Sequence, residues 1–221
     1  MKKHIVCFGD SNTHGYCADP NDSADRTDRF NEDERWTCLL QKALGEEYLV
    51  LEEGLSGRTT VFSDPLHECM SGLDVIYSTL MSHEPVDLLI IMLGTNDCKT
   101  RYRASASVIA KGLDQVIRKA RQNASRHFDL LVISPIHLGV GVGDADFDPE
   151  FDAASVAVSR NLANEYRKIA PQNHAAFLNA SDFAAPSVTD REHMDEKGHA
   201  ALADAIYNKI LALQKGLSHV I

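Results

Sequence analysis

Short apolar runs alternate along the chain with longer stretches in which apolar residues recur every three or four positions. The apolar runs have the length of buried strands and the longer stretches have the spacing of helices. The predicted strands are His4 to Phe8, Tyr48 to Leu51, Leu88 to Leu93, Leu130 to Ile133 and Ala176 to Leu178. Such alternation is typical of a parallel sheet covered by helices on both faces, so the pattern predicts an α/β protein.

Four stretches carry an apolar stripe at helical spacing, and we interpret each stripe as a face of the core. The first stripe lies between Trp36 and Leu44, and Gly45 then supplies a helix stop. The other stripes are Leu73, Ile76, Tyr77, Leu80 and Met81; Val108, Ile109, Val116, Ile117 and Ala120; and, after Asp195, Leu202, Ile206, Ile210 and Leu213.

Two polar segments interrupt the alternation. Residues 17–35 are rich in Asp, Asn and Arg and predict an insertion loop, which forms either a pocket rim, a subunit contact or a solvated surface. Residues 135–149 are rich in Gly and Asp, but their G-x-G-x-G differs from the dinucleotide motif, which follows the first strand and opens a helix. Since no repeat or linker is evident, we expect a single domain over residues 1–221.

Composition and charge narrow the classes of partner. The 221 residues are 44% hydrophobic and 24% charged, and the formal charge is −10, which disfavours nucleic acids and anionic membranes. The longest apolar run, Leu88 to Leu93, is far shorter than the roughly 20 residues of a membrane span. The start, MKKHIVCFGD, lacks the apolar core of a signal peptide, and five cysteines suit no disulfide scaffold or zinc ribbon. We therefore expect a cytoplasmic protein.

Residues that could take part in catalysis or binding follow the first three predicted strands. Ser11 lies in GDSNTHG after the first, Gly57 in EGLSGRTT after the second, and Asn96 in GTND after the third. In α/β sheets ligands bind at the carboxyl ends of the strands, where these residues would gather. Each also has a simpler structural interpretation, because serine and asparagine cap helices and glycine forms turns.

Asp190 and His193 stand three positions apart just before the last predicted helix. A serine nucleophile requires an imidazole that accepts its proton, and the imidazole requires a carboxylate that fixes its tautomer. The same histidine taken alone is as well explained as a surface residue near a helix start. The combination with Ser11, Gly57 and Asn96 favours nucleophilic acyl transfer.

These four blocks, GDS, SGRT, GTND and DREH, occur in the order found in the SGNH hydrolases, also called GDSL-type esterases and lipases, and the chain resembles that family over residues 9–193. FGDSNTHGY, ERW, EEGLSGRTT and IIMLGTND are similar to its arylesterase and acyltransferase branch. Asn12 departs from the motif, which has leucine there, and we expect this departure to affect the shape of the acyl pocket.

The resemblance implies a role for each matching residue. Ser11 would be the nucleophile, His193 the general base and then acid, and Asp190 its orienting carboxylate. The oxyanion hole would consist of the backbone N–H groups of Ser11 and Gly57 and the side-chain amide of Asn96, which agrees with the need for donors placed around a developing negative charge.

The expected fold is a flavodoxin-like three-layer α/β/α sandwich whose five-stranded parallel sheet has the order 2-1-3-4-5. The expected activity is that of a cofactor-independent and metal-independent serine esterase acting on small soluble acyl esters. The resemblance adds arylesterase activity, acyl transfer to alcohols and homo-oligomerisation.

Two other functions stay open at this stage. The hydroxyl-rich turn from Ser11 to Gly15 could hold the phosphate of a flavin, although this leaves Asn96 and the Asp190–His193 pair unexplained. A metallohydrolase could use Asp190 and His193 together with Asp195 and His199, but H-E-x-x-H is missing and His199 is in helical phase with the apolar stripe that follows it.

Overall fold

The computed structural model describes residues 1–122 and 124–217, and its centre is a parallel sheet with the strand order β2-β1-β3-β4-β5. The strands are β1 (Lys3–Gly9), β2 (Tyr48–Gly54), β3 (Leu88–Met92), β4 (Asp129–Ser134) and β5 (Ala176–Asn179). All five predicted strands and the predicted order are confirmed.

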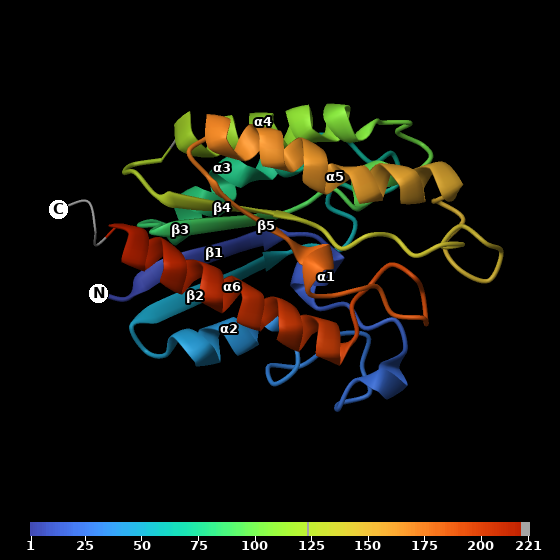
Figure 1. Ribbon diagram of the computed structural model, residues 1–221, viewed down its shortest axis with the longest axis horizontal. Coiled ribbons are helices and arrows are strands. Elements are labelled where there is room, and N and C mark those ends of the chain that lie inside the picture. Colours follow the sequence, from blue (N-terminus) through green and yellow to red (C-terminus); the bar gives the residue numbers. More distant parts are fainter. Residues whose placement is uncertain (123, 218–221) are drawn as a thin grey trace.

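Helices cover both faces of the sheet (Figure 1). One face carries α3 (Gly72–His83), α4 (Ala106–Gln122) and α5 (Ala153–Gln172), and the other carries α2 (Trp36–Leu44) and α6 (Glu196–Leu217). Successive side chains of a strand point to opposite faces, so Val6 and Phe8 pack toward the first set and Ile5 and Cys7 toward the second. The predicted α/β/α layers are confirmed.

The four predicted helices correspond to α2, α3, α4 and α6. Most of their stripe residues are buried, but Ala43, Tyr77 and Val108 are exposed. The predicted stripes are therefore wider than the buried helix faces at these three positions.

The helix α5 was missed by the sequence analysis. Its buried face contains Val156, Leu162 and Tyr166, and the serines Ser155 and Ser159 interrupt that apolar stripe. Both serine hydroxyls donate to backbone carbonyls, Ser155 to Cys98 at 2.7 Å and Ser159 to Val156 at 2.9 Å. Satisfied serines can therefore occupy core positions that the hydrophobic pattern counts as polar.

Short helices lie among the loops. They are α1 (Ser11–His14) and the 3₁₀ turns η1 (Pro20–Asp22), η2 (Asn96–Cys98) and η3 (Ala180–Asp182). Of these, α1 and η2 directly follow β1 and β3, so they begin at the carboxyl edge of the sheet. This edge lies at the end of the molecule away from the N-terminus and from the last described turn of α6 (Figure 1).

The end of α1 packs against the end of β2 at very short range. A Cβ atom on Gly54 would lie 2.2 Å from the backbone nitrogen of His14, so only glycine allows this approach.

Within the described ranges 1–122 and 124–217, no helix is long and apolar enough to cross a membrane.

Candidate active site

Ser11 is the first residue of α1, directly after the turn that ends β1. Asp10 is the N-cap of this helix and its Oδ1 accepts a hydrogen bond from the backbone nitrogen of Asn12 at 3.1 Å. The interpretation of Ser11 as a cap is therefore wrong, and its hydroxyl is left for another partner. The Asp10 carboxylate also occupies the helix N-terminus, where the flavin-binding alternative needs a phosphate.

The hydroxyl of Ser11 contacts His193, which lies 182 positions further along the chain. The distance from Ser11 Oγ to His193 Nε2 is 2.8 Å, and that from His193 Nδ1 to Asp190 Oδ2 is 2.5 Å. With Nδ1–H donating to the carboxylate, Nε2 accepts the serine proton. The structure thus brings Ser11, His193 and Asp190 into one hydrogen-bonded row.

Asp190 also shapes the turn that carries the histidine. Its Oδ1 accepts from the backbone nitrogens of Glu192 and His193, both at 2.9 Å. Burial raises the pKa of Asp190, but the hydrogen bonds and charge of His193 lower it by more, so the net shift is downward. Asp190 therefore stays ionised beside the imidazole at neutral pH.

The pKa of His193 is shifted upward. Burial by itself lowers it, but the charge of Glu192 and the hydrogen bond to Asp190 outweigh that effect. An imidazole with two acidic neighbours holds a proton more readily once it has taken one from a hydroxyl.

Gly57 and Asn96 lie on neighbouring turns at the same edge. Gly57 has φ +89°, in the region that favours glycine, and the Asn96 side-chain nitrogen donates to the carbonyl of Arg58 at 3.1 Å. The carboxylate of Asp97 accepts from the backbone nitrogen of Thr60 at 3.0 Å and also contacts its hydroxyl. Asp97 therefore joins the turn after β3 to the loop after β2. Asn96, which belongs to the first of these segments, is fixed by its own hydrogen bond to the second.

All five predicted site residues, Ser11, Gly57, Asn96, Asp190 and His193, line one cavity of about 370 Å³. The cavity is polar, since hydroxyl, amide and carboxylate groups make up most of its wall. The residues that the sequence analysis did not assign to a site are Tyr16, Ser56, Lys99, Asp146, Phe147, Asp148, Thr189 and Glu192.

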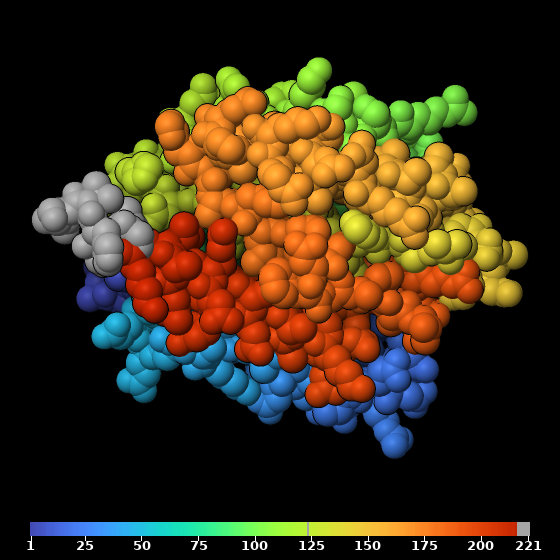
Figure 2. Space-filling model, viewed as in Figure 1, coloured from blue at the N-terminus to red at the C-terminus, as the bar shows by residue number. Residues whose placement is uncertain are grey.

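The two irregular segments contribute differently to this cavity. Residues 146–148, from the Gly- and Asp-rich loop, form part of its wall, whereas no residue of 17–35 does. The interpretation of 17–35 as a rim of this cavity is therefore wrong. That segment lies beside the turn that precedes α6, and Asp22 lines a surface groove together with Pro186 and Lys197 (Figure 2).

Asn12 does not line the cavity, so the expectation that it shapes the acyl pocket is wrong. It is 2% exposed, its Oδ1 accepts from the backbone nitrogen of Met194 at 3.0 Å, and its Nδ2 donates to the carbonyl of Glu192 at 3.5 Å. Asn12 therefore contacts the chain on both sides of His193. Its physical role is to join the serine turn to the histidine turn.

Glu192 is the functional candidate that the sequence analysis missed. It is 7% exposed, and its Oε1 lies 3.9 Å from Nε2 of His193. Burial raises the pKa of Glu192 to about 7, against a smaller lowering effect of the His193 charge. Its position directly before the histidine was the only available signal, and a glutamate in a turn is ordinarily a solvated one.

The four proposed metal ligands are not assembled. His199 is buried in α6, where its Nδ1 accepts from the backbone nitrogen of Trp36 at 3.3 Å, and Asp195 accepts from the backbone nitrogen of Gly198 at 2.8 Å. The interpretation of His199 as a packed residue is confirmed. Outside the undescribed positions 123 and 218–221, no group of three or more His, Cys, Asp or Glu side chains could hold a metal ion.

Comparison with known proteins gives a consistent family. The model of the GDSL-like lipase/acylhydrolase family matches residues 7–201. Est24, a carbohydrate acetylesterase from Sinorhizobium meliloti, is 30% identical with a TM-score of 0.86, over 96% of this chain and 100% of that one. The native aryl esterase of M. smegmatis is 31% identical with a TM-score of 0.83, over 96% and 99%. No curated protein matches the sequence significantly.

Proposed function

Because the chain belongs to the GDSL-like lipase/acylhydrolase family, which hydrolyses esters, we propose that it is a serine esterase that acts on short, soluble acyl esters through an acyl-enzyme on Ser11. The observation that supports this proposal best is the hydrogen-bonded row of Ser11, His193 and Asp190 on a cavity that Gly57 and Asn96 also line. The hydroxyl that would attack the ester therefore shares its cavity with the Gly57 turn and the Asn96 amide.

In the first half-reaction, Ser11 Oγ bonds to the ester carbonyl carbon while its proton passes to His193 Nε2. The negative charge that develops on the carbonyl oxygen is stabilised by the backbone N–H groups of Ser11 and Gly57 and by the Asn96 amide. The bond from carbon to the alcohol oxygen then breaks, and His193 gives its proton to that oxygen. Asp190 keeps the imidazole oriented throughout and stabilises its charged form.

In the second half-reaction, water gives a proton to His193 and attacks the acyl carbon. The bond to Ser11 Oγ breaks, the proton returns to the serine and the free acid leaves. An alcohol in place of water would give a new ester by the same steps, and we propose this acyl transfer as a competing reaction.

We propose that the acyl group is short. The cavity of about 370 Å³ is walled mainly by polar groups, which gain nothing from a long alkyl chain. Tyr16 is the member of the polar run after Ser11 that contributes to the wall, because Asn12, Thr13 and His14 lie outside it. Acetyl and butyryl esters should therefore have a much higher kcat/KM than esters of twelve or more carbons.

The test is pre-steady-state hydrolysis of p-nitrophenyl acetate. The proposal expects a burst of p-nitrophenol equal to the enzyme concentration, a transient mass increase of one acetyl group on the peptide with Ser11, and inactivation by a serine-reactive phosphonate. Adding a primary alcohol to a short vinyl ester should yield a new ester beside the free acid. A modified residue other than Ser11 would overturn the mechanism, and free acid as the only product would remove the transfer step alone.

We also propose that the protein works in the cytoplasm as a homo-oligomer, with residues 17–35 at a subunit contact. All five cysteines lie in the described ranges and are free thiols, which suits a reducing compartment. Light scattering of the full chain, compared with a variant whose exposed 17–35 side chains are replaced by serine, tests the subunit contact. An unchanged mass of the variant would contradict it.

A further inference from the structure

Glu192 presents a carboxyl group to the cavity without a hydrogen bond to any described residue. Its backbone is fixed on both sides, because its N–H donates to Asp190 and its carbonyl accepts from Asn12. The side chain is 9% exposed, and its Oε1 lies 3.9 Å from His193 Nε2, which is longer than a hydrogen bond. The buried carboxyl of Asp97, in contrast, has both a backbone and a hydroxyl donor from Thr60.

A carboxyl group that has lost most of its hydration and has no donor from the protein is costly in free energy, and a ligand in the cavity that carries a donor would reduce that cost. The upward shift of the Glu192 pKa agrees with this view, since it reflects the same loss of hydration. Both the neutral and the ionised form retain an oxygen that accepts a hydrogen bond. The group is therefore suited to bind a donor on the substrate.

The position of Glu192 identifies the part of the substrate that meets it. His193 Nε2 must lie within hydrogen-bonding distance of the leaving alcohol oxygen in order to protonate it. Glu192 Oε1 is 3.9 Å from that nitrogen, so a donor attached to the carbon next to the ester-bearing carbon can reach it. Glu192 therefore faces the alcohol part of the ester.

The other charges of the cavity disfavour an anionic alcohol. Asp146 and Asp148 also line it, and Lys99 Nζ is already paired with Glu150 at 2.5 Å. A neutral hydroxyl group meets these conditions without adding negative charge.

We propose that Glu192, together with His193 Nε2, forms a subsite that selects esters whose leaving alcohol bears a hydroxyl group vicinal to the ester oxygen, as in monoesters of diols and polyols. The hydroxyl donates to Glu192 while the ester oxygen receives the proton from His193. This inference rests on the proposed function and specifies the alcohol, which the two relatives named above leave open because one is named for carbohydrate esters and the other for aryl esters.

The test compares 2-hydroxyethyl acetate with 2-methoxyethyl acetate, which differ at the vicinal oxygen by a methyl group in place of the donated hydrogen. The measured quantity is the ratio of their kcat/KM values. For the unmodified enzyme we expect about tenfold or more in favour of the hydroxyl, which is the effect of one hydrogen bond to a charged group. Glu192→Met should bring the ratio to about one, and Glu192→Gln should retain part of it because its amide oxygen still accepts.

Asp146→Asn is the matched control, because it removes an acidic charge from the same wall but leaves Glu192 in place. It should retain the preference of the unmodified enzyme. Acetylcholine carries a cation without a donor at the same position, so its turnover separates charge from hydrogen bonding. A ratio near one in the unmodified enzyme, a ratio that survives Glu192→Met, or a preference for acetylcholine over the hydroxyethyl ester would each overturn the subsite.

Hydrolysis of p-nitrophenyl acetate distinguishes this result from failure of the proposed function, because that ester has no vicinal donor. Turnover of p-nitrophenyl acetate with no discrimination between the two glycol esters would remove the subsite and leave the esterase. Absence of turnover on all these esters would instead contradict the esterase itself.

Discussion

The two ends of the parallel sheet differ in how deeply their acidic side chains are buried. At the carboxyl end, Asp10, Asp97 and Glu192 are almost fully buried, and burial raises the pKa of each, to about 6 for the two aspartates and about 7 for the glutamate. At the amino end, Asp87 is partly exposed and pairs with Arg126 at 2.7 Å on the surface. Acidic groups are therefore desolvated at the carboxyl end, whereas Asp87 at the amino end is in contact with solvent.

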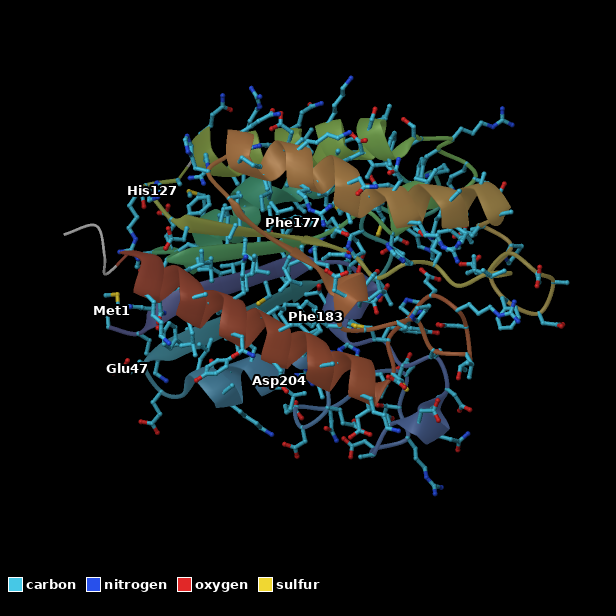
Figure 3. The ribbon with its side chains drawn as sticks, viewed as in Figure 1. Met1, Glu47, His127, Phe177, Phe183 and Asp204 are labelled. Atoms are coloured by element: carbon cyan, nitrogen blue, oxygen red, sulfur yellow. The ribbon has the colours of Figure 1, made fainter. Side chains whose placement is uncertain are left out.

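The amino end also has a cavity, of about 270 Å³, lined partly by Ile5, Leu88 and Ile210. Met1, Glu47 and His127 mark this end of the molecule in Figure 3, opposite the carboxyl ends of the strands. A hollow is therefore present at both ends, but only the carboxyl end combines it with a hydroxyl and an imidazole in contact. Buried polar contacts, more than cavity size, therefore distinguish the end that carries the candidate active site.

Ser11→Ala gives the largest expected effect, because it removes one oxygen from the carboxyl end and with it the proposed nucleophile. Turnover of p-nitrophenyl acetate should fall by about 10³-fold or more while the thermal unfolding midpoint stays close to that of the unmodified protein. Turnover like that of the unmodified protein would show that the polar end does not act through Ser11.

Asn96→Ala should lower kcat by about 10²–10³-fold, or roughly 3–4 kcal/mol, because one of the three proposed oxyanion donors is lost. The change should appear in kcat with little change in KM. An effect confined to KM would mean that Asn96 binds the ester equally in the ground state and the transition state.

Asn12→Leu installs the residue of the family motif and removes both contacts with the histidine turn. We expect kcat to fall by the same factor, about tenfold, for acetyl, butyryl and hexanoyl esters. The reason is that the substitution removes contacts that hold the turn of His193 and leaves the shape of the pocket unchanged. Leaving the Met194 nitrogen without a partner should also lower the free energy of unfolding by about 1–3 kcal/mol in urea titration. A change in chain-length preference would restore the pocket interpretation.

The pH profile sharpens the role of the buried acids around His193, which faces Asp190, Glu192 and Asp10 as charges and the Tyr16 ring at 4.5 Å between centroids. As the proposed base, His193 must be neutral to act, so its upward pKa shift places the acid limb of kcat/KM above the ordinary histidine value of about 6.5. Glu192→Gln removes a negative charge that favours the protonated imidazole, and the acid limb should move to lower pH. A move to higher pH would contradict this electrostatic account.

Asp87→Asn at the amino end should have the smallest effect. It weakens the exposed ion pair with Arg126. The backbone nitrogen of His4 donates a hydrogen bond to Asp87 Oδ2 at 2.8 Å, and the asparagine keeps a side-chain oxygen that can accept it. The free energy of unfolding should change by less than about 1 kcal/mol and kcat/KM should stay the same. A loss of activity comparable to that of Asn12→Leu would break the contrast between the two ends.

Local sequence patterns were sufficient for most of the fold. Buried strands such as Leu88–Met92 are continuous apolar runs, and helices such as Trp36–Leu44 show a clear period and a glycine stop. The pattern failed at α5, where Ser155 and Ser159 occupy buried positions by donating to nearby carbonyls. The pattern records which residues are apolar, and it does not record which polar ones find partners.

The sequence by itself determined the residues that meet at the carboxyl edge, because Ser11, Gly57 and Asn96 each directly follow a strand or its turn. Only the tertiary structure decided how they are held. Asn12 reaches Glu192 and Met194 across 180 and 182 positions of chain, and Glu192 becomes a buried carboxyl because other elements close around it. Local spacing fixes period and caps through neighbouring residues, whereas burial and hydrogen-bond partners at this edge depend on segments that meet only after the sheet has formed.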